Sequence, residues 1–223
     1  MKTHLIALLY AVFTCSSTDG RQFLGPQNGS QDPVSNDAFN QNKVNVTQDS
    51  RHQPEYYGYE RPCPNAEDIA PCVCTYDSED TTMSLNCSAV ESEDQLRQIF
   101  KSYFPFKNYR SFYIKNNNNI KVLESGVFNG ISFERIDITY SNLEVIELHA
   151  LDCCYETASE INVEVNRITS FPFHELSIFS KLSNFNIGYN SVSIILADAF
   201  NGLTALEGLQ LYNNQANIVG TFI

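Results

Sequence analysis

The chain has 223 residues, of which 43% are apolar and 18% are charged, and acidic residues outnumber basic ones by 26 to 14. The apolar fraction is ordinary for a folded protein and excludes full disorder or a collagen-like chain. The formal net charge of −12 repels phosphate backbones, so no nucleic-acid partner is expected.

Residues 1–17 have the features of a secretory signal peptide. Lys2 precedes an apolar run over residues 5–13, and the small residues at 14–17 supply a cleavage site. The apolar run is too short to span a bilayer, which makes a signal anchor the less favoured alternative. We therefore expect a secreted, extracellular protein without a membrane span, in which several of the seven cysteines form disulfides.

Residues 18–62 are expected to form a disordered polar tail. Gln, Asn, Ser, Asp and Gly dominate this stretch, and its isolated apolar residues bury too little surface to offset the entropy of ordering. Its acidic, tyrosine-rich end over 55–60 is interpreted as a linker, with tyrosine sulfation as the alternative. Sequons of the form N-x-S/T predict glycosylation at Asn28, Asn45 and Asn86.

Residues 63–108 combine four cysteines with one predicted helix. The cysteines have the spacing C-x8-C-x-C-x12-C, and sequence alone allows three pairings. Ser88 and Glu91 match a capping box, and Pro105 is expected to end the helix. Apolar residues at the spacing i, i+3, i+4 and i+7 predict its buried face: Leu96, Ile99, Phe100 and Tyr103.

Residues 109–223 carry an internal repeat. Five segments begin at residues 109, 133, 158, 182 and 206, an interval of 24 or 25 residues, and follow the leucine-rich-repeat template L-x-x-L-x-L-x-x-N. Two apolar residues of each short strand point inward because strand side chains alternate. These features predict an α/β solenoid that is curved, with a parallel sheet on its concave side and loops or short helical turns on its convex side.

The polar residue that closes each template is expected to turn the chain. Its amide can pair with loop backbone groups that would otherwise be buried without partners, so stacked repeats predict an Asn ladder. The ladder positions are Asn117, Ser141, Asn166, Asn190 and Asn214. Ser141 can satisfy fewer groups than Asn, and the first repeat has Asn119 where an apolar residue belongs, which predicts an irregular turn. No cysteine-rich cap follows the fifth repeat, and we interpret the repeat region as truncated, with pairing of the open end to another subunit as the alternative.

The repeats and the four cysteines together resemble secreted leucine-rich-repeat proteins. More narrowly, residues 63–74 resemble an arthropod group named after the non-catalytic subunit of oplophorus-luciferin 2-monooxygenase, a secreted shrimp luciferase. The resemblance implies an N-terminal cap in which Cys63 pairs with Cys74 and Cys72 pairs with Cys87. In that luciferase a separate small polypeptide carries the oxygenation chemistry. The resemblance therefore implies a supporting role and no catalysis.

The residues themselves give no case for an active site. The sequence contains no H-E-x-x-H, C-x-x-C, G-x-S-x-G or P-loop motif. His149 and His174 belong to loops of different repeats, without zinc-like neighbours. No catalytic residue, metal or cofactor is expected. The adjacent Cys153 and Cys154 are interpreted as a small loop staple, with a strained, redox-labile vicinal disulfide or cysteines outside this chain as alternatives.

The predicted functional surface is the concave face of the sheet, where residues between the inward apolar pairs point outward. It is polar and contains four tyrosines, a residue type favoured at interfaces. The candidate partner-binding residues are Tyr113, Arg135, Asp137, Tyr140, Glu160, Asn162, Glu164, Asn186, Tyr189, Gln210 and Tyr212. A merely solvated polar sheet is the competing interpretation.

These observations predict a secreted, non-catalytic leucine-rich-repeat binding protein that supports a separate secreted enzyme through a protein–protein contact. The alternative is an extracellular recognition or adhesion module that binds proteins or glycans without an enzyme partner. The sequence predicts no oligomeric state.

Overall fold

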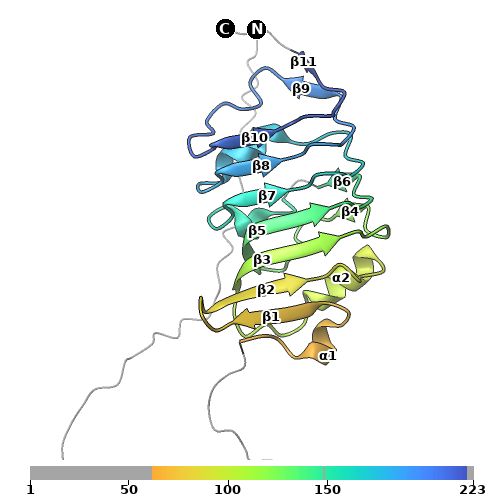
Figure 1. Cartoon of the computed structure of the whole chain (residues 1–223), viewed down its shortest axis with the longest axis vertical. Coiled ribbons are helices and arrows are strands. Elements are labelled where there is room, and N and C mark those ends of the chain that lie inside the picture. The colour runs from red at the N-terminus through yellow and green to blue at the C-terminus, as the bar shows by residue number, and fades with distance from the viewer. Residues whose placement is uncertain (1–61, 148, 220–223) are drawn as a thin grey trace, which may run out of the picture. The chain divides into compact units, whose positions relative to one another are not determined.

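The computed structural model describes residues 62–147 and 149–219, which form a mostly parallel β-sheet with few helices (Figure 1). The predicted signal peptide, the polar tail up to residue 61 and the sequons at Asn28 and Asn45 lie outside the described residues.

The main sheet has seven strands in the order β1-β2-β3-β5-β7-β8-β10. Only β1 and β2 pair antiparallel, and every later pair in this sheet is parallel. The strands are β1 (Val73–Asp77), β2 (Thr82–Asn86), β3 (Asn108–Lys115), β5 (Ser132–Thr139), β7 (Glu160–Asn162), β8 (Asn184–Asn186) and β10 (Gly208–Gln210).

Short elements occupy the segments between these strands. Two small parallel sheets pair β4 (Val122–Leu123) with β6 (Val145–Ile146), and β9 (Ile194–Leu196) with β11 (Asn217–Val219). The helical elements are α1 (Ala66–Ile69), α2 (Glu93–Ile99) and the 3-10 turns η1 (Asp152–Cys154) and η2 (Phe173–Ile178). From β3 onward each strand of the main sheet runs parallel to the one before it, so the intervening segment carries the chain back along the sheet.

The parallel strands are aligned so that equivalent apolar residues are direct neighbours. One such row runs across five strands through Phe112, Ile136, Ile161, Phe185 and Leu209. The first four are at most 2% exposed, whereas Leu209 is 37% exposed because β10 is the last strand of this sheet. Since a slip of one residue would turn every side chain to the opposite face, burial of this row fixes the register.

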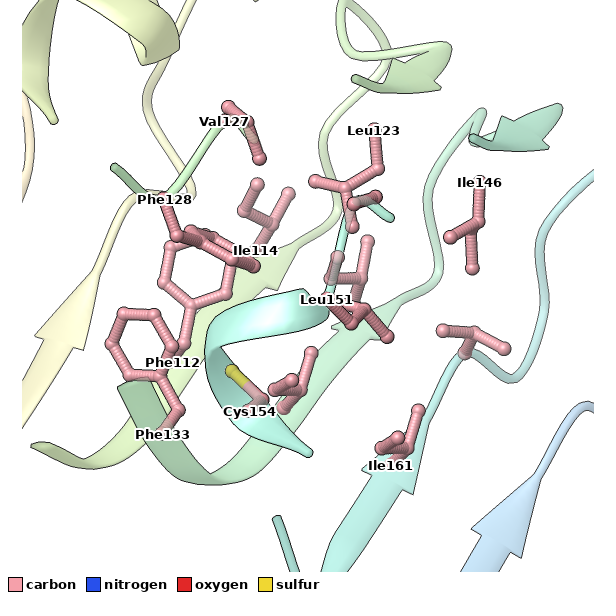
Figure 2. Close-up of a cluster of buried hydrophobic side chains, with 14 of the residues drawn as sticks. Phe112, Ile114, Leu123, Val127, Phe128, Phe133, Ile146, Leu151, Cys154 and Ile161 are labelled. Atoms are coloured by element: carbon pink, nitrogen blue, oxygen red, sulfur yellow. The ribbon is translucent and has the colours of Figure 1, made fainter. Parts of the chain in front are cut away.

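The core is rich in phenylalanine. Phe112, Phe128 and Phe133 lie together in Figure 2, with ring centroids 5.0–5.1 Å apart in tilted or edge-on contacts. The η1 turn places Leu151 and Cys154 in the same core (Figure 2). Aromatic pairs in these orientations stabilise beyond the area they bury. The hydroxyl of Tyr109 has no hydrogen-bond partner in this core, and burial raises its pKa.

The helix predicted from Ser88 begins later than expected, so the capping-box prediction is wrong. Ser92 is the N-cap residue of α2, and its Oγ accepts a hydrogen bond from the backbone N–H of Gln95. The helix ends at Ile99, well before Pro105. As a result Tyr103, predicted on the buried face, is 74% exposed.

Two disulfides join the segments around β1 and β2. Cys63 pairs with Cys74, and Cys72 pairs with Cys87. This is the pairing that the resemblance implies. Cys154 is buried and Cys153 is half-buried, and the loop staple proposed for them stays a prediction.

Candidate functional site

The sequence-predicted binding residues lie mainly on one face of the main sheet, opposite its buried apolar row. We call this surface, formed by the outward residues of β3, β5, β7, β8 and β10, the sheet face. The strand register makes each member of a row the neighbour of the next. The central row is Tyr113, Asp137, Asn162, Asn186 and Gln210, and the row beside it is Ser111, Arg135, Glu160, Asn184 and Gly208.

Much of the central row is already hydrogen-bonded within the chain. Asp137 accepts a hydrogen bond from the Thr139 hydroxyl at 2.9 Å and contacts Lys115 Nζ at 2.6 Å. Asn162 and Asn186 each accept a backbone N–H two residues further along the chain, at 3.1 and 2.9 Å. These contacts hold the side chains in fixed positions within the folded chain.

A residue with left-handed backbone follows each of the five strands of the sheet face, and this feature was not predicted from the sequence. These residues have φ between 52° and 55°, and they are Asn116, Tyr140, Val165, Tyr189 and Asn213. The conformation is uncommon for residues other than Gly, Asn and Asp, and it is strained for a β-branched residue such as Val165. Of these five residues, only Asn116 and Asn213 are of a type that favours the left-handed conformation, so only they could have indicated it from the sequence.

The ladder residues lie directly after these left-handed positions and connect neighbouring turns. Asn190 Oδ1 accepts the N–H of Ile168 at 2.9 Å, and Asn190 Nδ2 donates to the carbonyl of Val163 at 2.9 Å. Asn166 contacts the preceding turn in the same way through Leu143 and Ile138, and Asn214 does so through Val192 and Ile187. The ladder therefore fixes the strand ends from which the sheet-face tyrosines project.

Ser141 makes a different contact because its side chain is shorter. Its Oγ accepts the N–H of Asn117 at 3.0 Å. The N–H groups of Asn119 and Ile120 instead donate to Asn117 Oδ1, at 2.8 and 2.9 Å. This local ring gives the first repeat its irregular turn, in which Ile120 is buried and Asn119 is exposed.

Tyrosines gather at the strand ends toward β10. Tyr189 and Tyr212 meet edge-on, with ring centroids 5.3 Å apart. The Tyr212 hydroxyl donates to Glu164 Oε1 at 2.5 Å, and this hydrogen bond raises the pKa of Tyr212. Tyr140 directly follows β5, which β7 separates from β8, and it is 59% exposed.

The opposite end of the sheet face is a polar hollow bounded by β1, β2, β3 and β5. Its lining includes Glu79, Arg110, Tyr113 and Arg135. Arg110 forms an ion pair with Asp80 at 2.6 Å, and Arg135 pairs with Glu160 at 3.4 Å. The sequence did not predict that Arg110 lines this hollow, because Arg110 belongs to no recognisable motif.

The histidines and cysteines singled out in the sequence do not form one site. His149 lies 3.2 Å from Asp152 at η1, and His174 is an exposed residue of η2. Among residues 62–147 and 149–219, no three His, Cys, Asp or Glu side chains are grouped so that they could hold a metal ion. In the same part of the chain, no helix combines the length and apolar character needed to cross a membrane.

Comparison with known proteins relates part of the chain to a curated protein. No protein-family model matches the chain. The chain is 35% identical over 132 residues to a protein of Oplophorus gracilirostris named "Oplophorus-luciferin 2-monooxygenase non-catalytic subunit". The two chains are related over this stretch. The match covers 59% of this chain and 36% of the Oplophorus protein, so this chain spans about a third of that relative's length.

Proposed function

We propose that this protein is a secreted leucine-rich-repeat solenoid that serves as a non-catalytic binding subunit of a separate secreted enzyme. The observation that carries the proposal is the 35% identity over 132 residues to a protein named as a non-catalytic subunit of a luciferin monooxygenase. A protein with that role needs a surface for its catalytic partner rather than reactive groups of its own.

The arrangement of the strands supports the repeat architecture in this proposal. Residues spaced by 24 or 25 positions become direct neighbours in a parallel sheet, as in the pairing of Arg135 with Glu160 and of Glu160 with Asn184. Repeats that contact mainly their sequence neighbours build extended surfaces, and such surfaces are commonly used for binding. The two disulfides are compatible with secretion, because disulfides persist in oxidising compartments.

The sheet face is the proposed binding surface, and tyrosines are its proposed anchors. Tyr140, Tyr189 and Tyr212 are 45–59% exposed, and a tyrosine buries a large area with a polar tip when a partner covers it. Interface energy is usually concentrated in a few such residues. Glycans would use the same aromatic and amide groups, so an extracellular recognition module remains the second candidate.

The experiment is capture from native secreted fluid with the tagged, full-length protein. A Tyr113/Tyr140/Tyr189/Tyr212→Ala variant removes the proposed anchors, and a Tyr103→Ala variant removes an exposed tyrosine that lies outside the strands of the sheet face. The proposal predicts that the unmodified protein and the Tyr103→Ala control capture a polypeptide, and that the captured material oxidises oplophorus luciferin. The four-tyrosine variant should lose this activity.

One result would reject the enzyme-supporting role, and another would reject the sheet-face tyrosines as its binding surface. Capture of matrix or adhesion glycoproteins without luciferin oxidation would favour the recognition module. Equal capture by the four-tyrosine variant and by the unmodified protein would place the binding surface elsewhere. Circular dichroism of each variant distinguishes loss of binding from loss of folding.

A further inference from the structure

The strand ends of β7, β8 and β10 build an open corner from two aromatic rings and one carboxylate. We define the aromatic corner as Tyr189, Tyr212 and Glu164. The Tyr rings stand at 84° to each other, and the Tyr212 hydroxyl contacts Glu164 Oε1. Glu164 Oε2 accepts a second hydrogen bond from Asn186 Nδ2 at 3.1 Å. The carboxylate is therefore held at a fixed place beside the two rings.

The position of Tyr212 depends on the absence of a side chain beneath it. A Cβ at Gly188 would lie 2.8 Å from atoms of the Tyr212 ring, closer than normal van der Waals contact. The glycine lets the ring lie against the segment that follows β8 and reach Glu164, which lies two residues after β7. Both tyrosines nevertheless remain accessible, with Tyr189 50% and Tyr212 45% exposed.

Elsewhere on the sheet face, a tyrosine ring and a carboxylate together hold a lysine of the chain. Two strands earlier than Glu164, Lys115 Nζ lies 5.1 Å from the centroid of the Tyr113 ring and 2.6 Å from Asp137 Oδ2. The ammonium group there is held by one tyrosine ring and one carboxylate. This is a cation–π contact combined with an ion pair.

At the aromatic corner the chain supplies the ring and carboxylate groups but not the cation. Two residues take the place of Lys115 at this end of the sheet. They are Gly188, after β8, and Tyr212, after β10, and neither carries a positive charge. None of the ion pairs formed within the described residues involves Glu164. A carboxylate has about four acceptor positions, and the two observed hydrogen bonds leave room for a further donor.

We propose that the aromatic corner receives a basic side chain, lysine or arginine, from a protein partner. The partner's cation lies against the Tyr189 and Tyr212 rings and donates to Glu164, as Lys115 does at Tyr113 and Asp137. The net charge of −12 favours the approach of a basic surface. This inference rests on the proposed role of the sheet face in binding a protein, and it specifies the partner's chemistry at one position.

The test uses the full-length, disulfide-bonded protein with isotope-labelled tyrosine and follows the ring resonances of Tyr189 and Tyr212 by NMR. Nα-acetyl-arginine amide is the probe, and Nα-acetyl-citrulline amide is the neutral control of the same shape. We expect saturable, millimolar binding of the arginine probe that moves both tyrosine resonances, and no saturation with citrulline. Replacing Glu164 by Gln should weaken arginine binding about two- to fivefold, the effect of losing one exposed ion pair.

A matched control separates this site from the overall charge. Glu144→Gln removes a carboxylate that pairs with Lys121 at 3.7 Å, away from the corner, and should leave arginine binding unchanged. Equal shifts with citrulline and arginine would overturn the proposal, as would unchanged affinity in the Glu164→Gln variant. Saturable shifts with maltotriose alone would overturn it in favour of a glycan site.

The outcomes also distinguish this site from the proposed function. Arginine binding at the corner together with failure to capture an enzyme would retain the site and reject the enzyme-supporting role. If the unmodified protein does not bind arginine, and the Glu164→Gln variant still captures the enzyme in full, the enzyme-supporting role is retained and the site is rejected.

Discussion

The Asn ladder can be tested most sharply at Asn190, whose side chain is 7% exposed and makes four hydrogen bonds. In three of them Nδ2 donates to the backbone carbonyls of Val163, Ile187 and Gly188. Each of these carbonyls also accepts a hydrogen bond from a second donor, so it keeps a partner when Asn190 is replaced. Asn166 Nδ2 also donates to the carbonyl of Val163, Asn214 Nδ2 donates to Ile187, and the N–H of Val165 donates to Gly188. The fourth bond is different, because the buried N–H of Ile168 donates to Asn190 Oδ1.

Asn190→Ala therefore leaves the Ile168 N–H as the group that loses its partner. An unsatisfied buried donor costs about 1–3 kcal/mol, and we expect the free energy of unfolding to fall by that amount. The measurement is urea denaturation followed by circular dichroism, extrapolated to water. Hydrogen exchange of the Ile168 amide provides a local readout, and its protection should fall in the variant.

Asn184→Ala is the control for this prediction. Asn184 is the exposed first residue of β8, and among the described residues its Nδ2 donates only to the hydroxyl of Ser183. Its replacement should change stability by no more than about 0.5 kcal/mol. Equal effects of the two substitutions, together with unchanged protection of the Ile168 amide, would refute the ladder as a structural element.

Three further substitutions test individual features. Tyr109→Phe removes a buried hydroxyl that lacks a partner and should stabilise the protein by about 1 kcal/mol in urea denaturation; destabilisation would show that the hydroxyl is satisfied. Val165→Asn places a residue that tolerates φ near +54° at a strained position and should raise stability by about 1 kcal/mol, whereas the same change at exposed Thr169 should not. Gly188→Ala should displace the Tyr212 ring and return the Tyr212 pKa, raised by Glu164, toward its ordinary value; an unchanged pKa in a tyrosine titration would contradict this packing.

The sequence by itself determined which residues are neighbours across the main sheet. The interval of 24 or 25 residues and the alternation of apolar positions predicted the row from Phe112 to Leu209, and the strands pair in that register. This was predictable because burial of one face leaves a periodic pattern of apolar residues. The same alternation predicted which polar residues, such as Asp137 and Asn162, share the opposite face.

The local boundaries were less predictable from the sequence. Two serines, Ser88 and Ser92, each precede a suitable capping partner, and only the packed structure selects Ser92. Likewise, Tyr140 and Val165 adopt left-handed conformations against their own preference. The hydrogen bonds of the next turn impose those angles, and a pattern of single residues does not encode them.

Only the tertiary structure decided the composition of the aromatic corner. Tyr212 and Glu164 are 48 residues apart, and their contact depends on a glycine at position 188 and on the edge-on approach of Tyr189. The periodicity predicts which residues lie in the same row, but it does not predict which side chains from different strands contact one another. That choice follows from packing, because the tyrosine ring occupies the space that Gly188 leaves open.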